Sequence, residues 1–352
     1  MADSVLITGG AGFIGINLAD RLLEMGQPVL ILDNLSRAGV ERNLSWLRRR
    51  WNGRSTVEAA DVRDFNAVRL AVRRASRVYH LAAQVAVSTG LKDPLFDFDV
   101  NAKGTLNVLE AIRSAKHPIP LLLTSTNRVY GALNDIPVRQ EGLRYTPVAP
   151  DPRASAVDES RPLDLSSPYG CSKGAADQYV RDYSRTFGIP AAVFRMSCIY
   201  GPHQSGAEGE GWAGRVLLRA LTGLPTTIYG SGFEVSDILF VRDLVDALVI
   251  AMKEMPRLNG EAFNIGGGPE NTMSLLELVE LIREVSGIIP EFECSGARPG
   301  AQSYYVSDTR KFAGLTGWSP RTSVREGIGK LYQWAVEWLS PAAARALTAR
   351  HL

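Results

Sequence analysis

A tyrosine and a lysine lie four positions apart in the segment YGCSK, which runs from Tyr169 to Lys173. On a helix this spacing brings both side chains to one face, a turn apart. Ser167 and Pro168 are typical of an N-cap followed by proline at the first helical position, so Tyr169 should lie at a helix start. Because a nearby ammonium favours the phenolate, the pair predicts a tyrosine of lowered pKa. Such a phenol can accept a proton from a substrate hydroxyl while hydride leaves the same carbon.

A second reactive hydroxyl is predicted in the segment TST, from Thr124 to Thr126, which ends an apolar run. Ligands of open α/β sheets bind beyond the carboxyl ends of the strands. A threonine there can share the substrate proton with Tyr169, which makes Thr126 a catalytic candidate. An ordinary hydrogen-bonding cap at the strand end is the alternative.

The glycines of the segment GGAGFIG predict a dinucleotide site. Gly9, Gly12 and Gly15 lie between an apolar run and an amphipathic one. In such a turn the first glycine permits the tight bend, the second lets pyrophosphate approach the backbone, and the third lets helix and strand pack closely. The spacing is G-x-x-G-x-x-G rather than G-x-G-x-x-G, so a plain glycine turn is the alternative.

Two acidic residues indicate which dinucleotide the site would take. Asp33 ends the next apolar run, at about the separation expected of a ribose-binding carboxylate. A carboxylate there accepts hydrogen bonds from both adenosine ribose hydroxyls and repels a 2′-phosphate, which favours NAD over NADP, although Arg37 nearby weakens this preference. Asp61, together with Val62, is predicted at the adenine edge, with helix capping as the alternative for Asp61.

These residues are positioned by short apolar runs that alternate with amphipathic segments through the first half of the chain. The alternation predicts an α/β fold with a Rossmann-type doubly wound parallel sheet, covered by helices on both faces. The expected strands are 5–8, 29–32, 57–59, 77–81, 121–124 and 191–195, and the expected helices are 14–25, 66–74, 101–115 and 172–187.

The chain is predicted to divide into a larger and a smaller part. Residues 1–200 are expected to form the NAD-binding domain, with the strand and helix near 237–252 packing back on it. Residues 201–340 are expected to form a smaller C-terminal substrate-binding region, followed by a tail at 341–352. The stretch 132–164, rich in proline and charge, predicts a long loop that is either a functional lid or a surface excursion.

Composition argues against several other classes of protein. The net charge of +2 gives no electrostatic footprint for nucleic acid. Three scattered cysteines predict neither disulfides nor a zinc site, and the four histidines have no metal-ligand spacing. Because there is neither a leader segment nor an apolar run that could span a bilayer, no membrane contact and a cytoplasmic location are expected. The basic stretch 42–54 is expected to be a solvated helix face rather than a phosphate site.

The motifs together resemble the extended short-chain dehydrogenase/reductase family, the NAD-dependent epimerases and dehydratases. They are TGGAGFIG, DNLSR, HLAAQ, NxxGT, STxxVYG, YxxxK, YGP and a late RPG, and they extend over nearly the whole chain. The resemblance implies tightly held NAD, a nucleotide-sugar substrate, and catalysis by Thr126, Tyr169 and Lys173. The predicted cofactor-binding residues are Gly9, Gly12, Phe13, Ile14, Gly15, Asp33, Asn34, Ser36, Arg37, Asp61, Val62, Leu81, Ala82, Ala83, Gln84, Asn101, Thr124, Tyr169 and Lys173.

One position departs from the family pattern. Many relatives have an arginine where Ser236 stands, and that arginine holds the substrate diphosphate. Ser236 carries no charge, so Arg298, with Arg215 or Arg242, must contribute more of the anchoring. The predicted substrate-binding residues are Gln84, Thr126, Asn127, Ser197, His203, Arg215 and Arg298.

Within the family the sequence is similar to the CDP-paratose 2-epimerase (CDP-tyvelose 2-epimerase) branch, above all in the segment SPYGCSKGAADQY. Sister dehydratases place an acid beside the active-site threonine or serine, whereas Asn127 and Arg128 follow Thr126 here, so the resemblance implies an epimerase. The implied cycle removes hydride from C2, leaves a transient 2-keto sugar, rotates the sugar and returns hydride to the other face.

Other hypotheses stay open at this point. They are a UDP-sugar 4-epimerase or related hexose epimerase, a net NAD(P)-dependent reductase, and a non-catalytic NAD-sensing or scaffold protein. The intact set of Thr126, Tyr169 and Lys173 argues against the scaffold, and a CDP-sugar is favoured over a UDP-sugar. A homodimer or homotetramer is expected, because helices equivalent to 101–115 and 172–187 pair across a dimer interface in this family. Burial of their apolar faces inside the monomer is the alternative.

Overall fold

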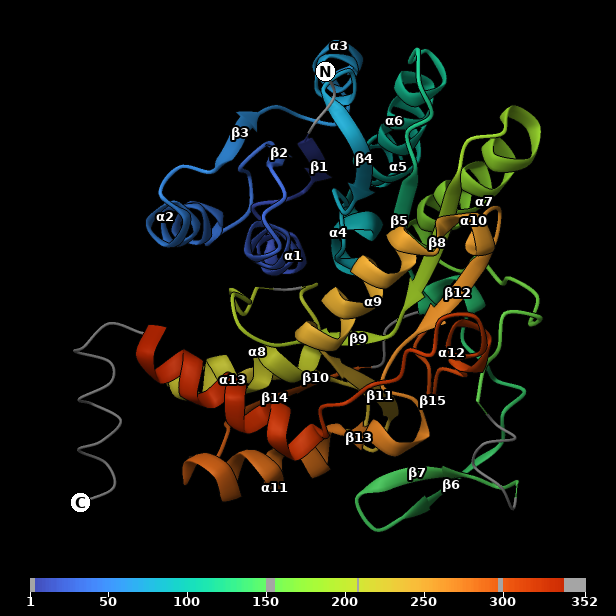
Figure 1. Ribbon diagram of the computed structural model, residues 1–352. Coiled ribbons are helices and arrows are strands. Elements are labelled where there is room, and N and C mark those ends of the chain that lie inside the picture. Colours follow the sequence, from blue (N-terminus) through green and yellow to red (C-terminus); the bar gives the residue numbers. More distant parts are fainter. Residues whose placement is uncertain (1–3, 150–155, 208, 297–299, 339–352) are drawn as a thin grey trace.

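The computed structural model describes residues 4–149, 156–207, 209–296 and 300–338, so the predicted tail at 341–352 and Arg298 lie outside the described residues. Its centre is a parallel sheet of seven strands in the order β12-β8-β5-β4-β1-β2-β3, seen in the upper half of Figure 1. This confirms the predicted doubly wound fold. The strands are β1 (Ser4–Thr8), β2 (Val29–Asp33), β3 (Ser55–Ala59), β4 (Ala75–His80), β5 (Leu121–Thr126), β8 (Ala191–Met196) and β12 (Ala262–Ile265).

Helices cover both faces of this sheet. One apolar layer contains residues of α1 (Phe13–Glu24), α2 (Val40–Trp51) and α9 (Val241–Lys253), and the other contains residues of α3 (Phe65–Val72), α6 (Gly104–Arg113) and α7 (Pro168–Phe187). The short helices α4 (Val87–Lys92) and α5 (Pro94–Phe98) and the π-helical segment η1 (Asp99–Lys103) lead from β4 into α6. Side chains on facing helices therefore bury the sheet on both sides, as its continuous apolar strands require.

A second region lies below the main sheet in Figure 1. Its central strand is β11 (Val235–Phe240), which pairs with β9 (Cys198–Tyr200), β13 (Thr272–Ser274) and β15 (Tyr304–Tyr305), while β10 (Thr226–Tyr229) pairs with β14 (Phe292–Ser295). Helices α8 (Trp212–Leu221), α11 (Leu275–Ser286) and α13 (Val324–Trp338) share one apolar cluster with β9, β11, β13 and β14. Two further short helices, α10 (Met255–Leu258) and α12 (Arg310–Thr316), complete the elements of the second half.

Three segments differ from, or add to, the sequence predictions. The stretch 132–164 contains an antiparallel hairpin, β6 (Val138–Glu141) with β7 (Arg144–Pro147), so it is not wholly irregular. Within 237–252, α9 packs on the main sheet as expected, but β11 belongs to the second sheet. The basic stretch begins within α2, and its three consecutive arginines are exposed, which confirms a solvated helix face.

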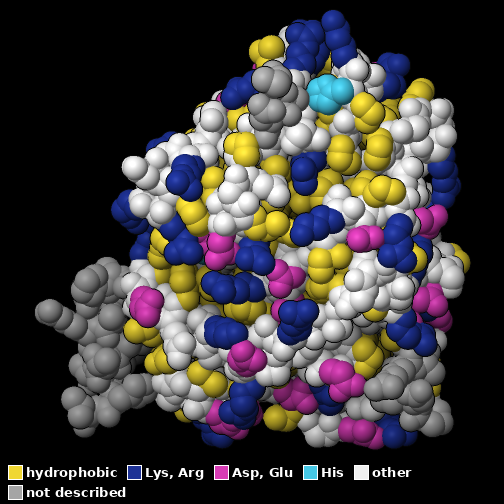
Figure 2. Space-filling model, in the orientation of Figure 1, with side chains coloured by type: hydrophobic (Ala, Val, Ile, Leu, Met, Phe, Trp, Pro, Cys, Tyr) yellow, Lys and Arg dark blue, Asp and Glu magenta, His cyan; other side chains and the backbone are white. Residues whose placement is uncertain are grey.

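The surface carries charges of both signs. On the face shown in Figure 2, Lys and Arg side chains are interspersed with Asp and Glu over the lower part of the molecule. Among the described residues, no helix combines the length and apolarity needed to cross a membrane.

Candidate active site

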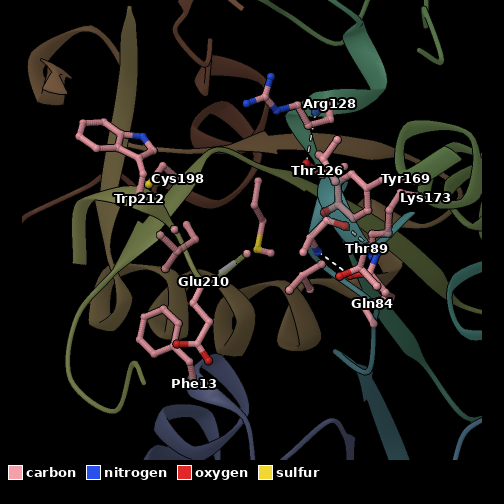
Figure 3. A pocket seen from close by; sticks show the side chains of 18 of the residues that line it. Phe13, Gln84, Thr89, Thr126, Arg128, Tyr169, Lys173, Cys198, Glu210 and Trp212 are labelled. Carbon is pink, nitrogen blue, oxygen red and sulfur yellow. Dashed lines mark hydrogen bonds between the residues drawn. The ribbon is translucent and has the colours of Figure 1, made fainter. Parts of the chain in front are cut away.

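A cavity of about 700 Å³ lies where the carboxyl ends of the main-sheet strands meet the second region. One side is lined by the glycine turn, the end of β2 and the end of β5. The other is lined by α8, β10 and residues around Ser236. Figure 3 shows Tyr169, Lys173 and Thr126 on one side of this space and Trp212 with Cys198 on the opposite side.

The glycine turn, which follows β1, forms one wall of the cavity. Gly9 has a φ of 68°, and a Cβ there would lie 2.7 Å from the Ala82 backbone nitrogen. A Cβ on Gly15 would lie 2.4 Å from the Gly9 carbonyl oxygen, so only glycine lets α1 pack this closely on the turn. Gly12 is the N-cap of α1 and offers no side-chain cap. The first N–H groups of α1, with the positive end of the helix dipole, therefore suit a pyrophosphate.

The end of β2 carries the acidic residue expected to bind ribose. Asp33 lines the cavity, and its carboxylate accepts hydrogen bonds from the backbone N–H of Ala11 (3.0 Å) and Leu35 (2.9 Å). Burial raises the pKa of Asp33 above its ordinary value. Arg37 also lines the cavity and lies 4.0 Å from Glu210 on the far loop.

Asp61 lines the same end of the cavity and is held by two neighbours. Arg63 donates to it at 2.9 Å and Asn34 Nδ2 donates at 2.9 Å. The hydrogen bond from Arg63 is the main reason that the pKa of Asp61 falls to about 2. The alternative role, capping α3, belongs instead to Asp64, which accepts from the backbone N–H of Asn66 and Ala67.

Replacing Asp33 with asparagine should relax the preference for NAD over NADP. The carboxylate repels a 2′-phosphate, and Arg37 beside it can bind one once that charge is removed. We expect the ratio of the two dissociation constants, measured by calorimetry, to move toward NADP by about tenfold, equivalent to about 1.4 kcal/mol. Asp61→Asn is the matched control, because the Asp61 charge is already paired with Arg63, and its ratio should stay at the wild-type value. An unchanged ratio in Asp33→Asn would contradict this role.

The catalytic helix begins as the sequence predicts. Ser167 caps α7 by accepting a hydrogen bond from the Gly170 N–H at 3.2 Å, and Pro168 takes the first helical position. Tyr169 therefore lies in the first turn, with its ring against the end of β5. Its phenol is hydrogen-bonded to the Thr126 side chain. Lys173, one turn further along, donates from Nζ to the Thr124 carbonyl oxygen at 2.7 Å.

The electrostatics of the phenol differ from the sequence prediction. Burial raises the pKa of Tyr169 above its ordinary value, and the hydrogen bond from Thr126 is the main influence that opposes the rise. The groups that lower the phenol pKa are Thr126, Arg128 and Arg37, whereas the Lys173 ammonium is directed to the Thr124 carbonyl. Burial also lowers the pKa of Lys173, to about 8.

Gln84 lines the cavity but is committed to other partners. Its Nε2 donates to the Ala86 carbonyl (2.8 Å) and to Asp97, and its Oε1 accepts from the Ala86 N–H (2.6 Å). Gln84 therefore has a structural role at this strand end, and its substrate contact stays a prediction. Asn101 does not line the cavity. It accepts from the Gln84 N–H at 2.9 Å and donates to the Gln84 carbonyl at 3.0 Å, which fixes the strand-end loop.

His203 lies away from the cavity, contrary to the prediction that it touches the sugar. Its ring centroid is 4.2 Å from Trp46 of α2, and 5.3 Å and 5.1 Å from Trp334 and Trp338 of α13. Burial lowers its pKa to about 4, so it is a neutral packing residue near pH 7. Its role is to join α2 to α13.

The other predicted contacts converge on the cavity. The lining residues among them are Gly9, Gly12, Phe13, Ile14, Gly15, Asp33, Asn34, Ser36, Arg37, Asp61, Val62, Leu81, Ala82, Ala83, Gln84, Thr124, Thr126, Asn127, Tyr169, Lys173, Ser197 and Arg215. Sequence reasoning missed Trp212 and Glu210, which also line it, and Gln302, whose Oε1 accepts from Asn127 at 3.3 Å. Nothing in their local sequence marks them, because each reaches the cavity from a loop or helix of the second region.

The cations on the substrate side are few. Of the described residues, the basic side chains that line the cavity are Arg37, Arg128, Lys173 and Arg215. Ser236 also lines it, and its hydroxyl donates to the Asp237 carbonyl at 3.2 Å. Arg242 is exposed on α9 and is not among the lining residues. Because Arg37 and Lys173 lie on the dinucleotide side, Arg128 and Arg215 are the charges that could face a substrate diphosphate.

The residues fit NAD. The turn at Gly9 to Gly15 leaves room and N–H donors for the pyrophosphate, and Asp33 lies where the adenosine ribose is bound in this fold. Lys173, which also lines the cavity, would hold the nicotinamide ribose. When bound, NAD supplies the hydride acceptor and donor. Thr126 and Tyr169 supply hydroxyl groups at the same strand end.

Comparisons with known proteins agree with this site. A family model described as GDP-mannose 4,6 dehydratase matches residues 6–331. The CDP-paratose 2-epimerase of Salmonella typhi is 39% identical, over 94% of this chain and 98% of that protein. The structure of a Thermus thermophilus UDP-glucose 4-epimerase in complex with NAD is 31% identical, with a TM-score of 0.78, over 94% of this chain and 98% of that one. A Bacillus cereus UDP-glucuronic acid 4-epimerase, in complex with UDP-glucuronic acid and NAD, is 26% identical, with a TM-score of 0.79, over 95% of this chain and 99% of that one.

Proposed function

Because the chain belongs to the GDP-mannose 4,6-dehydratase family of NAD-dependent nucleotide-sugar epimerases and dehydratases, we propose that it is a nucleotide-sugar 2-epimerase of the CDP-paratose type. The family membership, the use of NAD and the enzymatic nature expected from the sequence are confirmed. The carbon that inverts and the CDP-sugar are the proposed part. The observation that carries the proposal is the convergence of Thr126, Tyr169 and Lys173 on one cavity with the glycine turn.

This convergence suits hydride transfer at a carbinol carbon. As a phenolate, Tyr169 can accept the hydroxyl proton of the sugar and later return it, and the hydrogen bond from Thr126 favours this charged form. Lys173 is fixed by the Thr124 carbonyl beneath the phenol. The same oxygen accepts the proton and returns it. A transient keto sugar can therefore rotate and be reduced again, which inverts the carbon without net oxidation.

Two observations favour epimerisation over elimination. Asn127 and Arg128, rather than a carboxylate, follow Thr126, so the residues next to the active-site hydroxyl include no general acid for a leaving group. The carboxylates that line the cavity are engaged elsewhere: Asp33 and Asp61 at the dinucleotide end, Glu210 with Ser205, and Glu234 with Ser231 and Gly232. The likeness to the Salmonella typhi 2-epimerase supports inversion at C2.

We propose that Arg215 of α8 and Arg128 bind the substrate diphosphate in place of the arginine that relatives carry at position 236. Both line the cavity outside its dinucleotide half, and a guanidinium can bind a phosphate through two parallel hydrogen bonds. Arg128 is oriented by its own bond to the Gly300 carbonyl at 3.2 Å.

Incubation with matched CDP- and UDP-hexoses in D2O, followed by proton NMR, tests the proposal. We expect inversion at C2 of a CDP-sugar, with the C2 hydrogen retained, because hydride leaves and returns without meeting solvent. NAD should not be consumed. Inversion at C4 of a UDP-sugar would replace the proposal with a 4-epimerase, and stoichiometric oxidation or reduction of the cofactor would replace it with a net reductase.

A homodimer or homotetramer is also proposed. Apolar residues of the two helices expected to pair, including Val108, Leu109 and Val180, are instead buried within the monomer. Exposed apolar side chains nevertheless remain on α5 and α7, namely Leu95, Phe98, Tyr179 and Phe187. These favour an interface at α5 and α7, which sedimentation velocity would test, with a monomer at micromolar concentration contradicting it. A cytoplasmic location remains a prediction from the sequence.

A further inference from the structure

A buried carboxylate lies behind the catalytic helix and has no part in the chemistry described above. Asp97 belongs to α5, and its side chain is 0% exposed. Gly90 packs closely against this carboxylate. A Cβ on Gly90 would lie 3.1 Å from Asp97 Oδ1 and 3.3 Å from the Tyr169 backbone nitrogen. A carboxylate buried at this depth requires hydrogen bonds and a counter-charge.

The hydrogen bonds to Asp97 come from neutral groups. Ser172 Oγ donates to Oδ2 at 2.6 Å, and Gln84 Nε2 donates to Oδ1. Asn101 Nδ2 donates to Ser172 Oγ at 3.0 Å and also bonds the Gln84 carbonyl, which closes a ring of side chains. Ser172 directly precedes Lys173, so this ring fixes the turn of α7 that carries the lysine. It supplies no positive charge.

A second buried carboxylate near the lysine is already neutralised. Asp177 lies one helical turn beyond Lys173 and accepts two hydrogen bonds from the Arg195 guanidinium, at 2.8 Å and 3.1 Å. The side chains of this pair are 0% and 2% exposed. The charge of Asp177 is thus matched by Arg195, whereas no cation among the described residues lies at hydrogen-bond distance from Asp97.

We propose that Asp97 is the counter-ion of Lys173, a positioning residue that holds the buried lysine in its ammonium form. Both residues are buried, and Asp97 accepts a hydrogen bond from Ser172, the residue directly before Lys173 on α7. An ammonium donates a stronger hydrogen bond to the Thr124 carbonyl than a neutral amine does, and it would do the same to a nicotinamide ribose. Asp97 therefore acts through Lys173 and not on the substrate.

The other charged and titratable groups around Lys173 do not substitute for Asp97. They are His80 of β4, Arg195 of β8, and Tyr169 and Asp177 of α7 itself. Burial and the charge of Lys173 lower the pKa of His80 to about 3, so His80 is neutral at working pH. Tyr169 cannot carry a positive charge, and burial raises its pKa, which disfavours a negative one. The pair Arg195–Asp177 carries no net charge.

Loss of the Asp97 charge should lower the pKa of Lys173. Burial lowers the pKa of Lys173 to about 8, and the charges of Asp177 and Asp97 limit that fall. If the charge of Asp97 is removed, the Lys173 pKa must fall further, so the ammonium is lost at a lower pH. The alkaline limb of any activity that needs the ammonium moves to lower pH by the same amount.

Asp97→Asn is the sharpest test, because it removes the charge and keeps the shape. The new amide can accept from Gln84 through Oδ1 and donate to Ser172 through Nδ2, while the Ser172 hydroxyl turns to the Tyr169 carbonyl, 3.1 Å away. The protein has only seven lysines, so ¹³C at Cε can be followed by NMR over pH 6–11, with Lys173→Met identifying the signal. We expect the Lys173 midpoint to fall by about one pH unit relative to the wild type.

Two control variants separate charge from structure. Asp99→Asn removes an equal charge from an exposed site two residues away, and Ser172→Ala removes a hydrogen bond to Asp97 while keeping its charge. Both should keep the Lys173 midpoint nearer to the wild-type value than Asp97→Asn does. Asp97→Ser, a smaller neutral residue, should reproduce the shift if the asparagine variant does not fold. Coincident midpoints in folded Asp97 variants and the wild type would overturn the proposal.

Only the expected effect on turnover rests on the proposed function; the expected change in the Lys173 pKa does not. The NMR titration needs neither cofactor nor sugar nucleotide, so it remains decisive if the chain does not invert C2. Where turnover is measurable, the alkaline limb of kcat should shift with the NMR midpoint. A merely structural role would lower kcat at every pH and leave the limb in place.

Discussion

Tyr169→Phe is expected to lower kcat by about 10³-fold, within the range lost when a general acid-base is removed. The phenol oxygen is the only atom deleted, and its partner in the site is the Thr126 hydroxyl. The ring that packs at the start of α7 remains, so the folded structure and NAD binding should persist. Turnover on the substrate found by NMR, together with calorimetric binding of NAD, measures both.

Tyr179→Phe is the matched control for this experiment. Tyr179 lies on the same helix, and its side chain is 44% exposed, away from the cavity. Loss of its hydroxyl should leave kcat unchanged. If Tyr169→Phe retained more than a tenth of the wild-type turnover, the proton would have to pass through another group, with Thr126 the nearest alternative.

Gly15→Ala is expected to abolish retention of NAD and to destabilise the fold. The added Cβ would lie 2.4 Å from the Gly9 carbonyl oxygen and 2.6 Å from the Gly10 Cα, and both are backbone atoms that cannot rotate away. To admit it, α1 must move away from the turn, which displaces the N–H groups that bind pyrophosphate. We expect NAD to bind at least ~100-fold more weakly, equivalent to about 2.8 kcal/mol. The free energy of unfolding should fall by about 1–3 kcal/mol.

Calorimetry with NAD and thermal unfolding measure these two effects. Gly329→Ala in α13 is the control, because no atom lies within 4 Å of its added Cβ. Alanine in a helix interior should raise stability by about 0.5–1 kcal/mol and leave NAD affinity as it is. A Gly15→Ala protein that binds NAD like the wild type would show that the turn is not the pyrophosphate cradle.

Much of the main sheet is predictable from the chain because its strands are buried on both faces. A strand of this kind is a short, continuous apolar run, and β1, β2, β4, β5 and β8 lie within two residues of the predicted runs. The hairpin β6–β7 was missed for the opposite reason. The residues of β6, VRQE, are mostly exposed, so they carry no apolar pattern.

The placement of the candidate catalytic pair at a helix start was likewise predictable, since Tyr169, Lys173 and the Ser167 cap are local in sequence. His203 was misjudged because its partners are distant in the sequence. Only the packing of α2 against α13 shows that His203 lies among tryptophans. Only the contact between α5 and α7, 75 residues apart in sequence, reveals the carboxylate behind Lys173.

The sequence by itself determined the parallel sheet, the glycine turn, the acidic end of β2 and the spacing of the phenol and ammonium on one helix, because each depends on neighbours along the chain. The tertiary structure decided the charge state of that pair. Burial depth and the placement of Asp97, Asp177 and Arg195 set the pKa of a buried group. These are properties of the space around Lys173, and no local pattern of residues encodes them.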